Sequence, residues 1–260
     1  MPRVRHSPAP GSVAKTLVEN LEGRQSVFAA LQARQRRVEV ILISHGAHME
    51  KLDDLLALAE ERAVPIRRVD KSELDALAHG ATHGGVMAVC SPKPRLKGAE
   101  LQSFVAALRE PALLLLLEGV EDARNLGFTI RSAEALGAHA VLVKKHLWDL
   151  DAIEVARPSS GAYERLPLAQ IDSVEPLRAM QKTGVQLVGC IAGARRTIYD
   201  VEFARPTIIA VGGEKRGLSG AVRDICDCFA TIPTAGDGTS LSLSHAAAVA
   251  LAEAMRQRRT

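Results

Sequence analysis

Apolar and amphipathic segments alternate regularly over the C-terminal part of this chain. Short apolar runs at 111–118, 138–143, 186–191 and 207–211 predict strands, and helical spacing predicts helices near 125–136, 151–156 and 243–258. Buried strands that alternate with helices are typical of a parallel sheet covered on both faces. In such folds ligands bind beyond the carboxyl ends of the strands.

A smaller α/β pattern precedes this part. We expect helices over 23–32, 49–62 and 72–78, and strands at Val38–Ser44, Ile66–Val69 and Val86–Cys90. The prolines and basic residues of 91–98 predict a linker. We therefore predict a flexible tail at 1–18, a small α/β domain at 19–92, a linker and first helix at 93–110, and a larger α/β domain at 111–260.

Charge gives little information about function. The chain has 33 Lys and Arg against 30 Asp and Glu, a net charge of +3, and the first 100 residues carry the whole excess. Ordinary solvated charge explains this excess about as well as nucleic-acid binding does.

Composition argues against a metal or a membrane partner. The four cysteines, Cys90, Cys190, Cys226 and Cys228, lack the paired spacing of a zinc site, so we expect reduced thiols and no metal. No apolar run approaches the length of a membrane span. The first residues lack the apolar core of a secretory signal, which predicts a cytoplasmic protein, with an organellar transit segment as the alternative.

Three glycine-containing or serine-containing loops follow predicted strands of the larger domain. The first holds Asn125 and Arg131, the second reads GGEKRGLSG around Glu214, and the third contains Ser240 and Ser242 before the last helix. The second loop matches neither the P-loop pattern nor the dinucleotide fingerprint. Turn glycines and helix caps explain each loop alone, but together, at successive strand ends, the loops predict one ligand site.

These loops resemble the signature motifs of the SpoU/TrmH family of RNA 2'-O-ribose methyltransferases, in the SPOUT superfamily. NLGFTIRSA is similar to the family's N-x-G-x-x-x-R motif, VGGEKRGLS to its G-x-E-x-x-G-L motif, and IPTAGDGTSLSLSHAA to its third motif. RPSSGAYERLPL at 157–168 resembles a connecting segment. GRQSVFAAL and HGGVMAVCSP resemble the family's substrate-binding domain, which is similar to a ribosomal-protein fold.

The resemblance implies a C-terminal trefoil knot, a type of topology that is rare in proteins, and S-adenosylmethionine as cofactor. It also implies rRNA or tRNA as substrate and a homodimer formed through the catalytic domain. Cofactor-binding positions would be Gly212, Gly213, Ile232 and Leu241, and catalytic positions would be Asn125, Arg131, Glu214 and Ser240. The motif's third-loop Asn is Ser242 here, which replaces an amide by a hydroxyl on a shorter side chain, so the local hydrogen-bond network would differ from that of the family.

Several alternatives stay open. Arg131 would act as the base or as a phosphate clamp, and its structural alternative is an ion pair with Glu118 or Glu121. Glu214 could instead be a helix N-terminal carboxylate, and we expect His245 in a core or interface. Two alternatives to a ribose methyltransferase remain. One is a non-catalytic RNA-binding relative, which Ser242 suggests, and the other is a base methyltransferase on the same fold. The small residues of AAAVALAEAM favour close helix packing, and RQRR at 256–259 should stay solvated.

Overall fold

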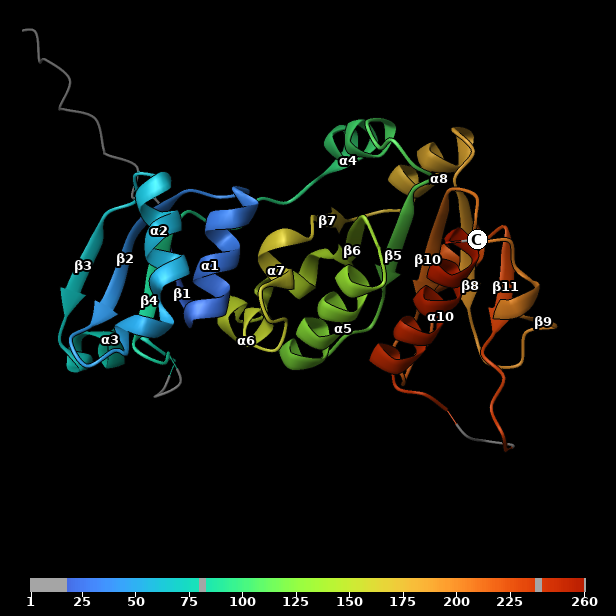
Figure 1. Ribbon diagram of the computed structural model, residues 1–260. Coiled ribbons are helices and arrows are strands. Elements are labelled where there is room, and N and C mark those ends of the chain that lie inside the picture. Colours follow the sequence, from blue (N-terminus) through green and yellow to red (C-terminus); the bar gives the residue numbers. More distant parts are fainter. Residues whose placement is uncertain (1–17, 80–82, 237–239, 260) are drawn as a thin grey trace, which may run out of the picture.

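The computed structural model describes residues 18–79, 83–236 and 240–259, which form two separate sheets flanked by helices (Figure 1). The predicted tail at 1–18 lies outside the described residues except for Val18. Within the described ranges, no helix has the length and apolar character needed to cross a membrane.

The N-terminal sheet has the order β1-β4-β2-β3, with β2 and β3 parallel and β4 antiparallel to both β1 and β2. Its three predicted strands are confirmed at their predicted bounds, whereas β1 was missed because its sequence, ENLE, is short and polar. The elements are β1 (Glu19–Glu22), α1 (Arg24–Ala33), β2 (Val38–Ser44), η1 (Met49–Lys51), α2 (Asp53–Glu61), β3 (Ile66–Val69), α3 (Lys71–Leu77) and β4 (Val86–Cys90).

The C-terminal sheet has the order β7-β6-β5-β10-β8-β11-β9, and all of its ladders are parallel. Its strands are β5 (Leu113–Leu117), β6 (Ala140–Lys144), β7 (Leu168–Ile171), β8 (Gln186–Cys190), β9 (Arg196–Thr197), β10 (Thr207–Val211) and β11 (Cys228–Thr231). Its helices are α4 (Gly98–Ala106), α5 (Ala123–Ala135), η2 (Lys145–Asp149), α6 (Ala152–Ala156), α7 (Ala162–Arg165), α8 (Glu175–Lys182), η3 (Ile198–Asp200), α9 (Gly220–Arg223) and α10 (Leu243–Arg258).

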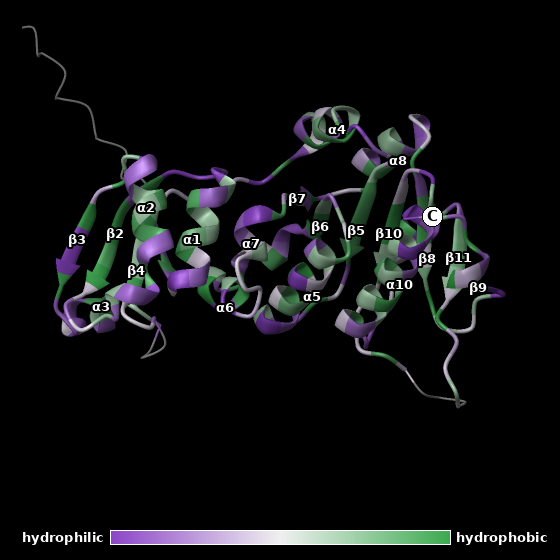
Figure 2. Ribbon diagram, viewed as in Figure 1, coloured by the Kyte–Doolittle hydropathy of each residue, from purple (hydrophilic) through white to green (hydrophobic). Residues whose placement is uncertain are grey.

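Helices cover both faces of this sheet, as the alternating pattern predicted. All five residues of β5 are buried, and so are all five of β10 beside it. Successive side chains of a strand point to opposite faces. Leu115 therefore packs in the cluster formed with α5 and α10, and Leu114 packs in the cluster formed with α4 and α8. Figure 2 shows these central strands in hydrophobic green between more polar helices.

The end of α10 is held against the sheet, so the expectation that RQRR stays solvated is wrong for Gln257 and Arg258, whereas Arg256 and Arg259 are exposed. The Arg258 guanidinium donates to the carbonyl oxygens of Phe203, Ala112 and Arg205 over 2.9–3.0 Å. Gln257 Nε2 donates to Val201 O over 2.9 Å. These groups satisfy backbone carbonyls at the amino-terminal edge of the sheet, a role that composition alone does not reveal.

A buried ion pair joins the two α/β units. Arg36, just after α1, donates from Nε and Nη2 to the two carboxylate oxygens of Glu164 in α7, over 2.8 and 2.6 Å. The two side chains are only 2% and 1% exposed. A third bond runs from Arg36 Nη1 to Glu19 Oε2 over 2.7 Å. The pair is bidentate, which fixes orientation as well as contact.

Lys93 extends this junction from the connecting segment. Its Nζ donates to Gln35 Oε1 over 2.6 Å and to Glu164 O over 3.2 Å. Burial lowers the pKa of Lys93 to about 8, and the nearby Glu164 carboxylate opposes that shift. The connecting segment is therefore tied to both units.

We expect Arg36→Ala to lower the free energy of unfolding by about 3–5 kcal/mol, because it leaves the Glu164 carboxylate buried without its partner. Arg37→Ala is the matched control. Arg37 is 70% exposed and pairs with Glu39, so its loss should cost at most about 1 kcal/mol. Urea denaturation measures both; equal effects of the two substitutions would contradict the role given to Arg36.

Candidate active site

The first two candidate loops meet because β5 and β10 are neighbours in the sheet. Leu117 pairs with Val211 at the carboxyl ends of these strands, and Glu118 N–H donates to Val211 O over 3.1 Å. The loops then enclose an open cavity of about 210 Å³. It is lined by Gly119, Val120, Glu121, Asp122, Asn125, Glu214, Lys215 and Leu243.

Glu118 anchors the second loop beneath this cavity. Its buried carboxylate accepts hydrogen bonds from Ser219 N over 2.7 Å and from Ser219 Oγ over 3.0 Å. Lys144, the last residue of β6, places Nζ 2.7 Å from Glu118 Oε1. One carboxylate thus joins the ends of β5 and β6 to the end of the loop that follows β10. This role was not predicted, although the position of Glu118 directly after an apolar strand was a usable signal.

Close backbone packing explains the glycines of the second loop. A Cβ on Gly213 would lie 2.5 Å from Gly119 O, and one on Gly212 would lie 2.1 Å from the carbonyl carbon of Gly217. Gly217 closes the loop by donating its N–H to Gly213 O over 2.8 Å. These contacts leave no room for a side chain at Gly212 or Gly213, so the loop presents backbone groups there. The side chains of Glu214 and Lys215 reach the cavity from the middle of the loop.

The predicted catalytic residues divide into two groups. Asn125 and Glu214 both line the cavity, and Asn125 N–H donates to Asp122 Oδ1 over 2.9 Å at the start of α5. Arg131 lies exposed on α5, two turns further along, and Ser240 lies exposed before α10. Neither of the latter two lines the cavity.

The predicted cofactor-binding residues lie at the same edge of the sheet without sharing that cavity. Gly212 and Gly213 follow β10, and Gly213 touches Gly119 of the cavity wall. Ile232 follows β11 and is half-buried against the core. Strand β8 separates β11 from β10 in the sheet. Leu241 is 39% exposed. Leu243, the first residue of α10 and part of the third motif, lines the cavity and was not predicted as a site residue.

The structure rules out two alternatives for the charged residues. Arg131 forms an ion pair with neither of the two glutamates named as its alternative partners; among the described residues, Glu118 pairs with Lys144, and Glu121 pairs with Lys215 over 2.6 Å. Glu214 is not a helix N-terminal carboxylate, since the next helix, α9, begins at Gly220.

Ser242 caps α10, and His245 is exposed beside it. Of the two positions expected for His245, the core is therefore wrong, and an interface stays a prediction. Ser242 Oγ accepts from His245 N and lies 2.6 Å from His245 Nδ1. It also lies 3.1 Å from Ser244 Oγ. Neighbouring polar groups therefore satisfy the Ser242 hydroxyl, and the effect of Ser at this position on activity stays a prediction.

The cavity carries more negative than positive charge. Glu121, Asp122 and Glu214 line it together with Lys215, which is itself paired with Glu121. Such a site favours a ligand that carries a positive charge. In the described part of the chain, no group of three or more His, Cys, Asp or Glu side chains could hold a metal ion.

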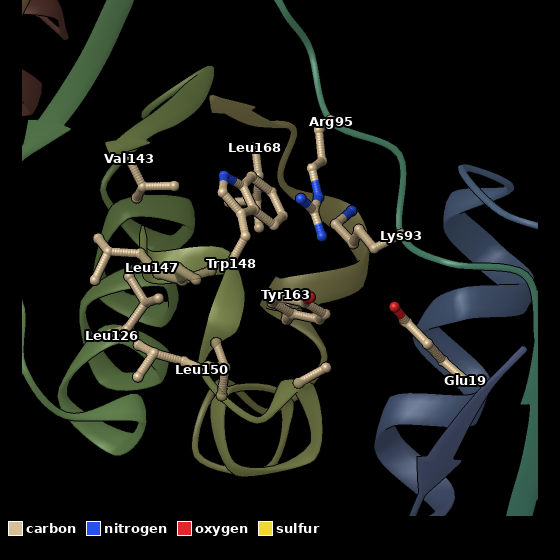
Figure 3. Close-up of a pocket in the computed structure, with 13 residues that line it drawn as sticks. Glu19, Lys93, Arg95, Leu126, Val143, Leu147, Trp148, Leu150, Tyr163 and Leu168 are labelled. Atoms are coloured by element: carbon tan, nitrogen blue, oxygen red, sulfur yellow. The ribbon is translucent and has the colours of Figure 1, made fainter. Parts of the chain in front are cut away.

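A second, smaller cavity lies at the junction of the two units (Figure 3). Its volume is about 40 Å³, room for little more than one water molecule. Arg95 of the connecting segment stacks on Trp148, with its guanidinium carbon 4.2 Å from the ring centroid. Tyr163 and Glu19 line the opposite side. The cavity lacks the converging strand-end loops of the first, and its stacked pair fastens the connecting segment to η2.

Two family models match the chain. Residues 112–252 match the SpoU rRNA Methylase family, and residues 21–96 match the RNA 2'-O ribose methyltransferase substrate binding family. The two matches correspond to the C-terminal and the N-terminal sheets with their helices.

Relatives resemble the chain over nearly its full length. The 23S rRNA (guanosine-2'-O-)-methyltransferase RlmB of Pseudomonas putida is 35% identical over 93% of this chain and 97% of its own. The RlmB of Escherichia coli strain K12 is 32% identical over 92% of this chain and 99% of its own.

Solved structures of similar proteins have the same fold. A crystal structure described as an RNA 2'-O ribose methyltransferase superposes with a TM-score of 0.75 at 29% identity, covering 94% of this chain and 90% of the other. The SpoU methyltransferase AviRb from Streptomyces viridochromogenes, in complex with AdoMet, gives 0.77 at 28% identity, with 93% and 91% covered.

We expect Gly213→Ala to destabilise the fold by about 1–3 kcal/mol, because the added methyl group meets the backbone of Gly119. Gly220→Ala is the control, since a Cβ there meets nothing within 4 Å. The midpoint of urea denaturation reports both changes. If the two variants have the same urea midpoint, the close contact between Gly213 and Gly119 does not limit side-chain size at Gly213.

Proposed function

Because this chain belongs to the SpoU rRNA methylase family, we propose that it transfers the methyl group of S-adenosylmethionine to a ribose 2'-hydroxyl of ribosomal RNA. The observation that carries the proposal is the meeting of the first two motif loops, with Asn125 and Glu214, around one cavity. The names of the similar RlmB proteins favour a guanosine of 23S rRNA as the target over tRNA.

The test of this function is methylation of protein-free RNA by the purified full-length chain. We expect transfer to 23S rRNA and little transfer to 16S rRNA or tRNA. Transfer to tRNA alone would contradict the proposed substrate while leaving the enzyme class in place. Cofactor binding without transfer to any RNA would favour the alternative of a non-catalytic RNA-binding relative.

We assign RNA binding to the N-terminal unit, 19–92, and catalysis to the unit at 111–260, with 93–110 connecting them. The match of residues 21–96 to a substrate-binding model supports this division. The family resemblance supports a ribosomal-protein-like N-terminal fold, a C-terminal trefoil knot and action in the cytoplasm, where ribosomal RNA is found.

The residues around the cavity fit the cofactor. S-adenosylmethionine supplies an electrophilic methyl group on a positively charged sulfur, and the carboxylates of Glu121, Asp122 and Glu214 suit that charge. The glycine contacts leave loop backbone at Gly212 and Gly213 for polar parts of the cofactor. Ile232 and Leu241 supply apolar surface at the same strand ends for its adenine ring.

The reaction needs a positioned ribose hydroxyl and an acceptor for its proton. We assign the acceptor role to the Glu214 carboxylate, which is exposed at the cavity, because a carboxylate can take a proton that an arginine cannot. The Asn125 amide and the Ser240 hydroxyl would bind the ribose and hold the oxygen in line with the methyl carbon.

Arg131 is best suited to clamp a phosphate beside the reacting ribose. Its guanidinium stays protonated and can bind a phosphate through two parallel hydrogen bonds. It is exposed and forms no ion pair with the described residues. It lies one turn beyond Phe128, which is 51% exposed on the same helix.

We expect Arg131→Ala to reduce methylation at least about a hundredfold, the effect of losing one charge-stabilising group, while the Kd for S-adenosylmethionine stays nearly unchanged. The control is Arg124→Ala on the same helix, whose side chain pairs with Glu154. Single-turnover methylation and calorimetry give the two values. Parallel loss of activity and cofactor affinity in Arg131→Ala would indicate a structural role.

We also propose a homodimer formed through the catalytic unit. Phe128 on α5 is the large apolar side chain that a partner would cover, and α10 packs directly against α5. We expect light scattering at micromolar concentration to give twice the mass of the chain, and Phe128→Glu to shift it toward the monomer. A fully active monomeric wild type would contradict this assembly.

A further inference from the structure

The far edge of the C-terminal sheet carries a small surface of two arginines and a tyrosine, hereafter the edge patch: Arg195, Arg196 and Tyr199. The Tyr199 ring is 61% exposed, the largest exposed fraction among the large hydrophobic side chains that the structure describes. Both arginines are exposed. Neither Arg195 nor Tyr199 forms a side-chain hydrogen bond, ion pair or ring contact with the described residues.

The backbone that carries the edge patch is firmly held. Arg196 pairs with Ala230, and Thr197 pairs with Thr231, in the ladder between β9 and β11. Asp200 Oδ2 accepts from both N and Oγ1 of Thr197 over 2.8 Å, which closes the η3 turn. Ile198 inside that turn is fully buried. The outward direction of Tyr199 is therefore built into an ordered turn.

The edge patch lies next to the third motif. Thr231, the partner of Thr197, is the last residue of β11 and immediately precedes Ile232. The N-terminal sheet lies at the opposite end of the molecule, with the strand ends of the catalytic sheet between (Figure 1). An RNA held by the N-terminal unit and threaded past the cavity would reach the edge patch on the far side.

We propose that the edge patch is a second RNA-binding surface, on which an unpaired base stacks against Tyr199 while Arg195 binds the adjoining phosphate. The inference rests on the proposed function and extends it to single-stranded RNA beside the target nucleotide. Aromatic rings combined with arginines are the usual means by which proteins bind unpaired nucleotides.

The composition of the surface favours RNA over a protein partner. Protein interfaces bury a contiguous apolar centre. Among the described residues from 150 to 259, only Tyr199 and Leu241 are large exposed hydrophobic side chains. One exposed ring flanked by cations has too little apolar area for such an interface, but it is enough for one base.

The test measures binding of a labelled, unstructured 12-nucleotide RNA to the full-length chain over a series of salt concentrations. Tyr199→Ala should weaken binding by about 5- to 100-fold, the effect of losing one stacked base, and Tyr199→Trp should restore it. Arg195→Ala should lower the salt dependence, d log K/d log [salt], by about 0.7, the loss of one phosphate contact. Arg178→Ala, an exposed arginine on α8, is the control and should leave both values unchanged.

Cofactor affinity and the urea midpoint, measured on the same variants, should match the wild type. Wild-type RNA affinity and salt dependence in Tyr199→Ala and Arg195→Ala would overturn the edge patch while leaving the proposed function intact. A change of oligomeric state in Tyr199→Ala would instead make the edge patch a contact between copies of this chain. If the wild type neither binds nor methylates RNA, the proposed function fails as well.

Discussion

The candidate active site exists because β10 lies between β5 and β8 in the C-terminal sheet. Strands β5 and β10 are nearly 100 residues apart in the chain, yet their carboxyl ends lie in register, so the loops after them share one space. The Glu118 carboxylate then holds the second loop through Ser219, and the pair of Gly119 and Gly213 brings the two backbones into contact. The cavity with Asn125 and Glu214 is the product of these contacts.

The junction between the two units adds a second constraint. The ion pair between Arg36 and Glu164 is buried, so separating the two units would leave both charges without their partners. Nearby, Arg95 stacks on Trp148 and fastens the connecting segment. In the proposed function, the N-terminal unit then presents RNA to the strand ends at a fixed orientation, with Arg131 and the edge patch as further contacts. Rigid placement of this kind lowers the entropic cost of bringing a particular ribose to the cavity.

Local patterns in the sequence predicted much of this fold. Val38–Ser44 and Thr207–Val211 have the apolar, β-branched composition of strands, and both strands occupy the predicted residues. The motif loops gave the candidate residues, of which Asn125 and Glu214 line one cavity. Their assigned roles stay predictions, as do those of Arg131 and Ser240.

What the sequence could not provide are contacts between distant residues. Nothing near Arg36 indicates Glu164, 128 positions away. Nothing in RQRR indicates that Arg258 binds carbonyl groups at the amino-terminal edge of the sheet. Strand order also depends on contacts between distant residues. Along the chain β8 precedes β10 and β11, whereas in the sheet β8 lies between them. Short polar strands such as β1 escape detection because pairing with β4, rather than composition, makes them strands.

Ribose 2'-O-methylation is tested most directly by locating the transferred methyl group in the RNA product. Protein-free 23S rRNA would be methylated by the purified chain with labelled S-adenosylmethionine and then hydrolysed completely in alkali. A 2'-O-methyl group blocks cleavage of the adjoining phosphodiester, so we expect the label to be recovered in an alkali-resistant dinucleotide. Recovery of the label in mononucleotides would place the methyl group on a base and contradict ribose 2'-O-methylation.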